Sequence, residues 1–181
     1  MNAALFRTET SDGRFPAQAA GGVTIPNVEY HINGFEMLAA GNVTNKWRLY
    51  SGYTYLDSEV TKAPSSSFAV GQQLGGMPKH SFNVFSTYDV TQKITLGGGL
   101  QYVAKQTSGV QPAATGDLKI NIPGYTVADI YATYKFNRQT QLRLNLFNAA
   151  NTRYISQLAE GGAQGIPGKG RQLIATLRHD F

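Results

Sequence analysis

The sequence contains no cysteine, few charged residues and no long apolar run. Without cysteine, the chain cannot be a disulfide-stapled domain or hold a thiolate metal site. Charged residues make up 15% of the 181 residues, against about 25% in an average soluble domain. No stretch approaches the roughly 18 consecutive apolar residues of a membrane helix. The low charge therefore has a cause other than a transmembrane helix.

Two further signals are missing. The first ten residues, MNAALFRTET, have no basic region followed by an apolar stretch, so they are not a signal peptide. The net charge is +5, but lysine and arginine are scattered singly, and no basic run is interleaved with aromatic residues. We therefore expect no nucleic-acid partner.

What the chain does contain is repeated alternation of apolar and polar residues. The segments KITLGGGLQYVAKQ (93–106), PGYTVADIYATYKF (123–136) and TQLRLNLFN (140–148) each place apolar side chains at every second position. Because successive side chains of a strand point to opposite faces, each segment predicts a strand with one apolar and one polar face. Helical periodicity is nearly absent.

This alternation predicts an all-β, antiparallel, up-and-down arrangement of about eight strands. Their connections alternate between short segments, such as GNVTN, VTQ and NRQT, and long segments rich in Gly, Pro, Ser and Gln. Short turns at one end and long loops at the other are typical of outer-membrane β-barrels. The predicted strands cover residues 2–9, 28–40, 46–60, 80–90, 93–105, 124–136, 140–149 and 170–181.

Aromatic residues fit the membrane interpretation. Trp47, Tyr88 and Phe136 lie beside the short turns, and Tyr102 lies toward the long loops, as in the two interfacial girdles of such barrels. The alternative is that these rings are packing residues of a soluble sheet. A strand of about ten tilted residues also spans the roughly 25 Å apolar band of these barrels.

Several phrases, taken in order, resemble the C-terminal part of the β-barrel of a TonB-dependent ferric siderophore receptor. The resemblance implies a 22-stranded outer-membrane barrel filled by a plug domain and coupled to the TonB complex. It further implies that residues 1–181 are a C-terminal barrel segment, with the plug and the earlier strands absent. The phrases are INGFEML, WRLYSGYTYLDSEV, GGMPKHSFNVFSTY, LGGGLQYVAKQ, IPGYTVADIYATYKF, LRLNLFNAANTRYI and LIATLRHDF.

The polar face carries charged residues that we expect to face the barrel lumen and the plug. The alternative for each is a lumen charge that pairs with its neighbours and with water. These residues are Arg48, Arg143, Arg178, Glu36 and Asp129.

The long loops are expected to contact the ligand. Iron in a siderophore already has its oxygen ligands, so the protein needs aromatic, cationic and amide groups rather than a metal site or cofactor of its own. Residues of suitable type are Tyr154, Gln157, Phe68, Gln72, Lys105 and Lys119.

Catalysis and a resident metal are not indicated. The three histidines, His31, His80 and His179, fall on separate strands without the short spacing of metal ligands. Asp57 and Glu59 share one face of a strand, and the sequence places no histidine with them. We therefore expect a protein that is not an enzyme.

The last residues alternate apolar and polar side chains and end on an aromatic ring. This resembles the C-terminal signal that the barrel-assembly machinery recognises, and its members are Leu173, Ala175, Leu177, His179 and Phe181.

Two other functions stay open from the sequence. An independent eight-stranded barrel could act as an anchor or adhesin, since eight strands suffice for closure. A soluble lipid-binding barrel would instead keep its apolar residues inside.

Overall fold

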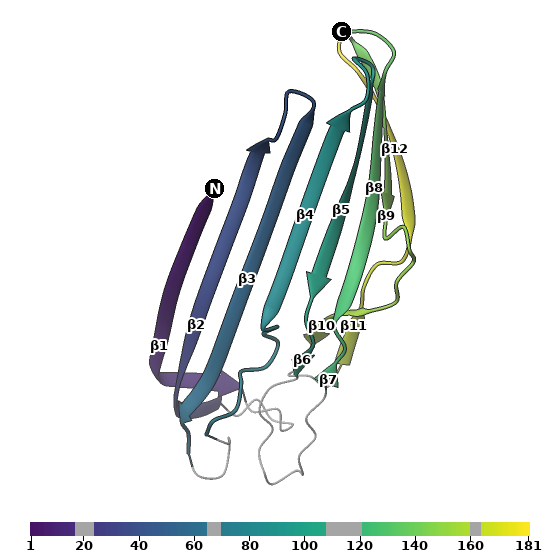
Figure 1. Cartoon of the computed structure of the whole chain (residues 1–181). Coiled ribbons are helices and arrows are strands. Elements are labelled where there is room, and N and C mark those ends of the chain that lie inside the picture. Colours follow the sequence, from purple (N-terminus) through teal and green to yellow (C-terminus); the bar gives the residue numbers. More distant parts are fainter. Residues whose placement is uncertain (17–23, 65–69, 108–120, 160–163) are drawn as a thin grey trace.

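The structure is a computed structural model, and it describes residues 1–16, 24–64, 70–107, 121–159 and 164–181. Eight antiparallel strands form one sheet in the order β1-β2-β3-β4-β5-β8-β9-β12 (Figure 1). This confirms the predicted strands and their up-and-down order. The strands are β1 (Asn2–Pro16), β2 (Thr24–Asn42), β3 (Trp47–Lys62), β4 (His80–Asp89), β5 (Ile94–Val103), β8 (Tyr125–Lys135), β9 (Thr140–Phe147) and β12 (Gln172–His179).

The first two strands extend further than the sequence predicts. β1 and β2 continue beyond residues 9 and 28 into a segment that was expected to be a loop. Their pairing register shifts between Thr10 and Gly13 and again between Gly13 and Phe15, and Asp12 adopts a positive φ of 55°. Such bulges break the period-2 pattern, so alternation alone ends the strand too early.

Two short hairpins also form within segments that were expected to lack strands. β6 (Gln106–Thr107) pairs with β7 (Asn121–Ile122), and β10 (Ile155–Ala159) pairs with β11 (Gln164–Pro167). Both hairpins lie at the long-loop end of the sheet (Figure 1). The long-loop end therefore contains two short sheets in addition to the eight-stranded sheet.

The three short turns lie together at the other end of the sheet (Figure 1). In each turn one side-chain oxygen accepts hydrogen bonds from two backbone N–H groups, two and three residues later. The acceptors are the hydroxyls of Thr44 and Thr91 and the amide oxygen of Asn137. These local bonds replace ladder bonds where the chain reverses.

The pairing register gives the sheet two chemically different faces. The polar face carries Glu36, Arg48, Thr87, Thr133 and Arg143, among others. The apolar face is strongly exposed: Leu5 is 84% exposed, Leu173 68% and Ile130 54%. A soluble monomer rarely leaves so much contiguous apolar surface uncovered.

The apolar face has an uncharged band bounded by aromatic residues. On β3 the band runs from Trp47 to Tyr55, about 25 Å at roughly 3.3 Å per residue. Charged residues on this face, such as Arg7 and Asp57, come only toward the long-loop end. This length along the strand is comparable to the apolar band of about 25 Å on an outer-membrane barrel.

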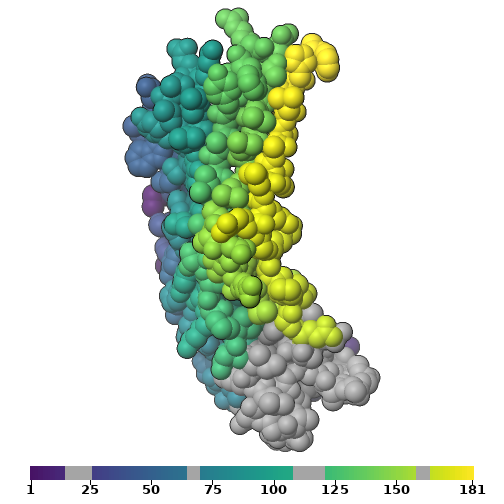
Figure 2. Space-filling model, turned by 90° about the vertical axis from the view of Figure 1, so that its right-hand side faces the viewer, coloured from purple at the N-terminus to yellow at the C-terminus, as the bar shows by residue number. Residues whose placement is uncertain are grey.

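The sheet is open. β1 and β12 each pair on one side only, and no described strand joins them. Figure 2 shows the C-terminal residues, in yellow, along one side of the molecule. In lipid each unpaired backbone group costs several kcal/mol, so these edges require further strands. The described residues include no helix of the length and apolarity that crossing a membrane requires.

Glycines on β5 let side chains from β4 and β8 meet above it. Phe85 of β4 and Tyr131 of β8 lie with ring centroids 6.0 Å apart, although β5 separates their strands. The intervening positions on the polar face are Gly97 and Gly99, which offer no side chain in the way. A Cβ at Gly97 would approach the Ser86 carbonyl oxygen to 2.6 Å.

We therefore expect Gly97→Ala to destabilise the complete protein by about 1–3 kcal/mol, because backbone must shift to admit the methyl group. Gly41→Ala is the matched control, since nothing lies within 4 Å of a Cβ there. Guanidinium unfolding in detergent micelles measures both free energies. Equal stability of the two variants would show that the β5 glycines are not required by packing.

Candidate functional site

The polar face is hollowed near the short turns. The hollow has a volume of about 530 Å³ and is lined from five strands, β3, β4, β5, β8 and β9. Its lining side chains are polar, cationic or aromatic. They are Arg48, Tyr50, Phe85, Thr87, Thr95, Tyr131, Thr133, Lys135, Gln141, Arg143 and Asn145.

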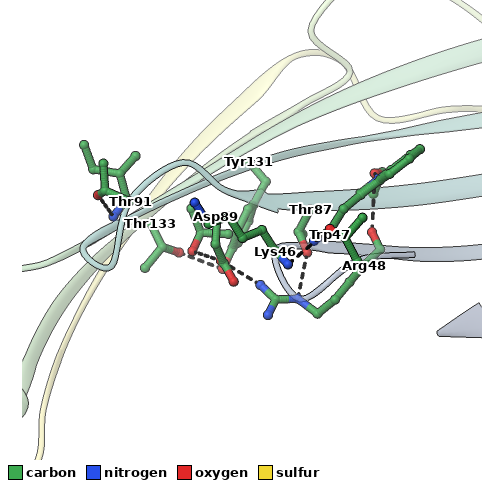
Figure 3. Close-up of polar contacts among 12 residues, drawn as sticks. Lys46, Trp47, Arg48, Thr87, Asp89, Thr91, Tyr131 and Thr133 are labelled. Atoms are coloured by element: carbon green, nitrogen blue, oxygen red, sulfur yellow. Dashed lines mark hydrogen bonds and ion pairs between the residues drawn. The ribbon is translucent and has the colours of Figure 1, made fainter. Parts of the chain in front are cut away.

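Arg48 is held in place at one side of the hollow (Figure 3). Its guanidinium donates from Nη2 to Asp89 Oδ1 at 2.8 Å and from Nε to Thr87 Oγ1 at 3.1 Å. The Thr95 hydroxyl donates to the same Asp89 oxygen at 2.6 Å. The charge of Arg48 is therefore balanced within the wall.

Arg143 has a different environment. Its guanidinium carbon lies 5.8 Å from the ring centre of Tyr131, a cation–π distance. The Thr133 hydroxyl donates to the Tyr131 hydroxyl oxygen at 2.6 Å, which leaves the Tyr131 proton available to another acceptor. No carboxylate of the described residues forms an ion pair with Arg143.

All five residues predicted to face the lumen lie on the polar face, but they do not form one cluster. Arg48 and Arg143 line the hollow, whereas Arg178 pairs with Asp180 at 2.9 Å. Glu36 lies opposite Thr54 on β2 and β3, away from the hollow. The pairings of Arg48 and Arg178 follow the alternative in which lumen charges balance one another.

Asp129 has a structural contact that its position in the sequence did not suggest. Its Oδ1 accepts a hydrogen bond from the backbone N–H of Asn148 at 2.8 Å. Asn148 is 3% exposed and has a positive φ of 46°. Asp129 therefore fixes the end of β9 rather than standing free in the lumen.

Asn148 joins three parts of the chain at the long-loop end. Its Nδ2 donates to the carbonyls of Thr152 and Lys169, at 2.9 and 3.0 Å. Its Oδ1 accepts from the Thr152 N–H at 2.8 Å. Sequence reasoning missed this residue, although the AsnAlaAlaAsnThr segment is rich in asparagine, which tolerates positive φ and bonds nearby backbone.

Tyr154, predicted to contact the ligand, belongs to an aromatic pair beside a hollow of about 580 Å³. Its ring centroid lies 4.2 Å from that of Tyr125. Gly168 lies against the Tyr154 ring, where a Cβ would clash, and its N–H donates to the Tyr154 carbonyl at 2.8 Å. The Tyr154 ring therefore lies between the Tyr125 ring and the Gly168 backbone.

The other predicted loop residues are not brought together with Tyr154. Gln157 lies exposed on β10, Lys105 is exposed between β5 and β6, and Gln72 is half-buried in the β3–β4 connection. Phe68 and Lys119 lie outside the described residues.

A histidine does lie beside Glu59, contrary to the prediction. His31 and Glu59 are directly paired across β2 and β3, with Nε2 and Oε2 3.9 Å apart. Two positions far apart in the sequence can meet in this way because antiparallel pairing depends on register, which the sequence pattern left undefined here. The described residues contain no group of three or more His, Asp or Glu side chains that could hold a metal ion.

Lys79 pairs with Asp57 on the same side of the sheet. Its Nζ lies 2.9 Å from Asp57 Oδ1, and this hydrogen bond raises the pKa of Lys79 above its ordinary value. The pair lies at the long-loop end, beyond the uncharged band.

Comparison with known proteins decides the family. The model described as "TonB dependent receptor-like, beta-barrel" matches residues 1–149. The chain belongs to this family. It is therefore a segment of an outer-membrane β-barrel, and the resemblance inferred from its phrases is confirmed.

Two relatives are named as siderophore receptors. The probable TonB-dependent siderophore receptor PiuA of Acinetobacter baumannii is 33% identical over 191 residues, covering 100% of this chain and 24% of PiuA. The catecholate siderophore receptor Fiu of Escherichia coli K12 is 28% identical, covering 100% and 23%. The chain thus spans about a quarter of the length of these relatives.

Solved structures agree with this assignment. The closed form of Fiu, described as a ferric-catecholate import receptor, superposes with a TM-score of 0.81 at 28% identity, over 99% of this chain and 25% of Fiu. The siderophore receptor PiuA superposes with a TM-score of 0.78 at 27% identity, over 98% and 25%.

In this receptor segment the residues predicted to form the aromatic girdles all lie at positions of the apolar face. Trp47 lies opposite Tyr88 across β3 and β4, and its Nε1 donates to Ser86 Oγ at 2.7 Å. Phe136 packs edge-on against Tyr134 at 4.9 Å. Tyr102, which is 42% exposed, lies at the opposite end of its strand. Their contact with the membrane interface stays a prediction.

We expect Asn148→Ala to destabilise the complete receptor by about 2–4 kcal/mol, because three part-buried hydrogen bonds to the backbone of Thr152 and Lys169 are lost. Asn137→Ala, in an exposed turn with the same kind of bond, should cost about 1 kcal/mol or less. Denaturant unfolding measures both values, and limited proteolysis should cleave the 152–171 connection faster only in the first variant. Unchanged cleavage there would contradict the structural role of Asn148.

Proposed function

We propose that the receptor containing this segment takes up ferric siderophores. The segment contributes part of the barrel wall and some of the ligand-binding loops. The observation that carries this proposal is the match of the entire chain to PiuA and Fiu, both named as siderophore receptors. The partners that the family implies for the complete receptor are a plug domain within the barrel and the TonB complex.

The chemistry of the long-loop end supports a ligand of this class. A ferric siderophore presents aryl or amide groups around an iron whose oxygen ligands are already complete. Tyr154, packed against Tyr125, offers an aromatic surface beside a hollow whose lining is largely apolar. Iron is then cargo held by its chelator, and we propose no resident metal, cofactor or catalytic role for this protein.

An independent eight-stranded anchor or adhesin is the second candidate. It requires β1 to pair with β12, because only closure removes exposed strand edges in lipid. In the structure the two strands lie at opposite edges of the sheet. This arrangement favours the receptor.

Binding of a ferric catecholate to the complete receptor, followed by fluorescence quenching, tests the proposal. We expect saturable binding, and Tyr154→Ala should raise Kd about tenfold through loss of an aromatic contact worth roughly 1.4 kcal/mol. Tyr88→Ala, on the apolar face near the short turns, is the matched control and should leave Kd unchanged. Absence of saturable binding to the unmodified receptor would overturn the proposed substrate class.

We further propose that the barrel-assembly machinery recognises the C-terminal stripe. Leu173, Ala175, Leu177 and His179 share the apolar face of β12, and Phe181 packs edge-on against His179 at 4.8 Å. Phe181 is fully exposed. An aromatic ring that packs on no other described element is available to an assembly factor.

We expect Phe181→Ala to reduce the amount of folded, heat-modifiable receptor in the outer membrane, because the terminal ring of the stripe is lost. Asp180→Asn, one residue earlier and on the other face, is the control and should assemble normally. Equal amounts of folded receptor in both variants, by electrophoresis of unheated membranes, would remove Phe181 from this role.

A further inference from the structure

The described residues include a hydrophobic cluster at the long-loop end of the sheet. Val28 and Val60 are fully buried, Leu74 is 8% exposed, and Tyr30 and Met77 pack against them. Val28 and Tyr30 belong to β2 and Val60 to β3, whereas Leu74 and Met77 lie in the connection between β3 and β4. We call residues 70–79 of this segment the β3–β4 connection. It packs onto the strands through its own apolar side chains, which removes them from water.

The backbone of the β3–β4 connection forms a β-bulge against β3. The Gly71 N–H donates to the Val60 carbonyl at 2.8 Å, and the Val60 N–H donates to the Gln72 carbonyl at 2.9 Å. Two residues of the connection therefore oppose one residue of the strand, and Gly71 has a positive φ of 86°. A bulge whose first residue is a left-handed glycine can re-aim the side chain beside it. That neighbour is Gln72, which the sequence predicts to contact the ligand.

Two further hydrogen bonds hold the middle of the β3–β4 connection. The Leu74 N–H donates to Ser58 Oγ on β3 at 3.0 Å, and the Gly76 N–H donates to the Thr107 carbonyl on β6 at 2.9 Å. The connection is thus tied both to the main sheet and to the β6–β7 hairpin. A segment with buried apolar contacts and paired backbone groups belongs to the more stable parts of a fold and opens rarely.

We propose that the β3–β4 connection is a preformed, stationary part of the ligand entrance, in which Leu74 is a positioning residue for Gln72. The proposal rests on the proposed function, because the ligand is the one that the complete receptor takes up. Leu74 acts through the connection and needs no contact with the ligand. A segment that is ordered before the ligand arrives adds no ordering cost to binding, so it raises affinity without moving.

Movement of this connection onto a ligand would carry a clear cost. Leu74 would have to leave the cluster around Val28 and Val60, which would return buried apolar surface to water. The bulge bonds between Val60 and residues 71 and 72 would also break, leaving backbone groups to find new partners. These costs favour a fixed wall over a closing element.

Hydrogen exchange of the complete receptor, followed by mass spectrometry, tests the proposal first without ligand. Amides of residues 71–76 should exchange about 100-fold more slowly than in an unstructured peptide of the same sequence. Leu74→Ala should remove about tenfold or more of this protection, whereas Leu74→Met, which conserves volume, should retain it. Exchange in the unmodified receptor as fast as in the free peptide would overturn the proposal.

Saturating ferric catecholate separates a stationary wall from a closing one. The exchange rates of residues 71–76 should be the same with and without this ligand. A slowing of about tenfold on binding would show that the connection becomes ordered around the ligand, and would overturn the proposal. Absence of ferric catecholate binding would instead overturn the proposed function. The exchange of the free receptor is measured independently, so the two proposals fail separately.

Affinity distinguishes the positioning role from a general loss of stability. Leu74→Ala should raise the Kd for ferric catecholate about tenfold, because Gln72 loses its fixed place, and Leu74→Met should restore the original Kd. Gly97→Ala, which we expect to destabilise the sheet away from the entrance, is the matched control and should leave Kd unchanged. In a Gln72→Ala background, Leu74→Ala should change Kd by less than about twofold. An unchanged Kd in Leu74→Ala, or fully additive effects at the two positions, would remove Leu74 from this role.

Discussion

In a bilayer every main-chain N–H and C=O group needs a partner within the protein, and the rest of this structure follows from that constraint. Antiparallel ladders satisfy it along seven strand pairings of the sheet. Among the eight strands of this sheet, the outer edges of β1 and β12 are left unpaired. Stable insertion into a bilayer therefore requires further strands that pair with these two edges.

The same ladders enforce the difference between the two faces. Once register is fixed, every second side chain of all eight strands faces one side, and a slip of one residue would exchange the faces. This explains why Arg48, Thr87 and Tyr131, on three different strands, share one row of the polar face. The glycines of β5 lie on the same face and carry no side chain, so the rings of Phe85 and Tyr131 can meet across them.

Strand number, order and face assignment could be predicted because alternation is a property of neighbouring residues. The extension of β1 past residue 9 could not, because a bulge at Asp12 and Gly13 interrupts the alternation. The roles of Asn148 and Asp129 were also missed. Their contacts join residues 19 positions apart and reach Lys169, a distance over which periodicity carries no information. The pairing of His31 with Glu59 could not be predicted for the same reason.

Charges are satisfied differently at the two ends of the sheet. Beyond the uncharged band, Lys79 pairs with Asp57 and Lys62 with Glu29. On the polar face near the short turns, Asp89 binds Arg48 and also interacts electrostatically with Lys135. The side chains of Lys135 and Arg143 are exposed, so water solvates their charges. An exposed cation needs no ion pair for stability, because solvent screening leaves a surface salt bridge worth about 1 kcal/mol or less. Pairing along the polar face is therefore a local property of each residue's neighbours and not a requirement of the fold.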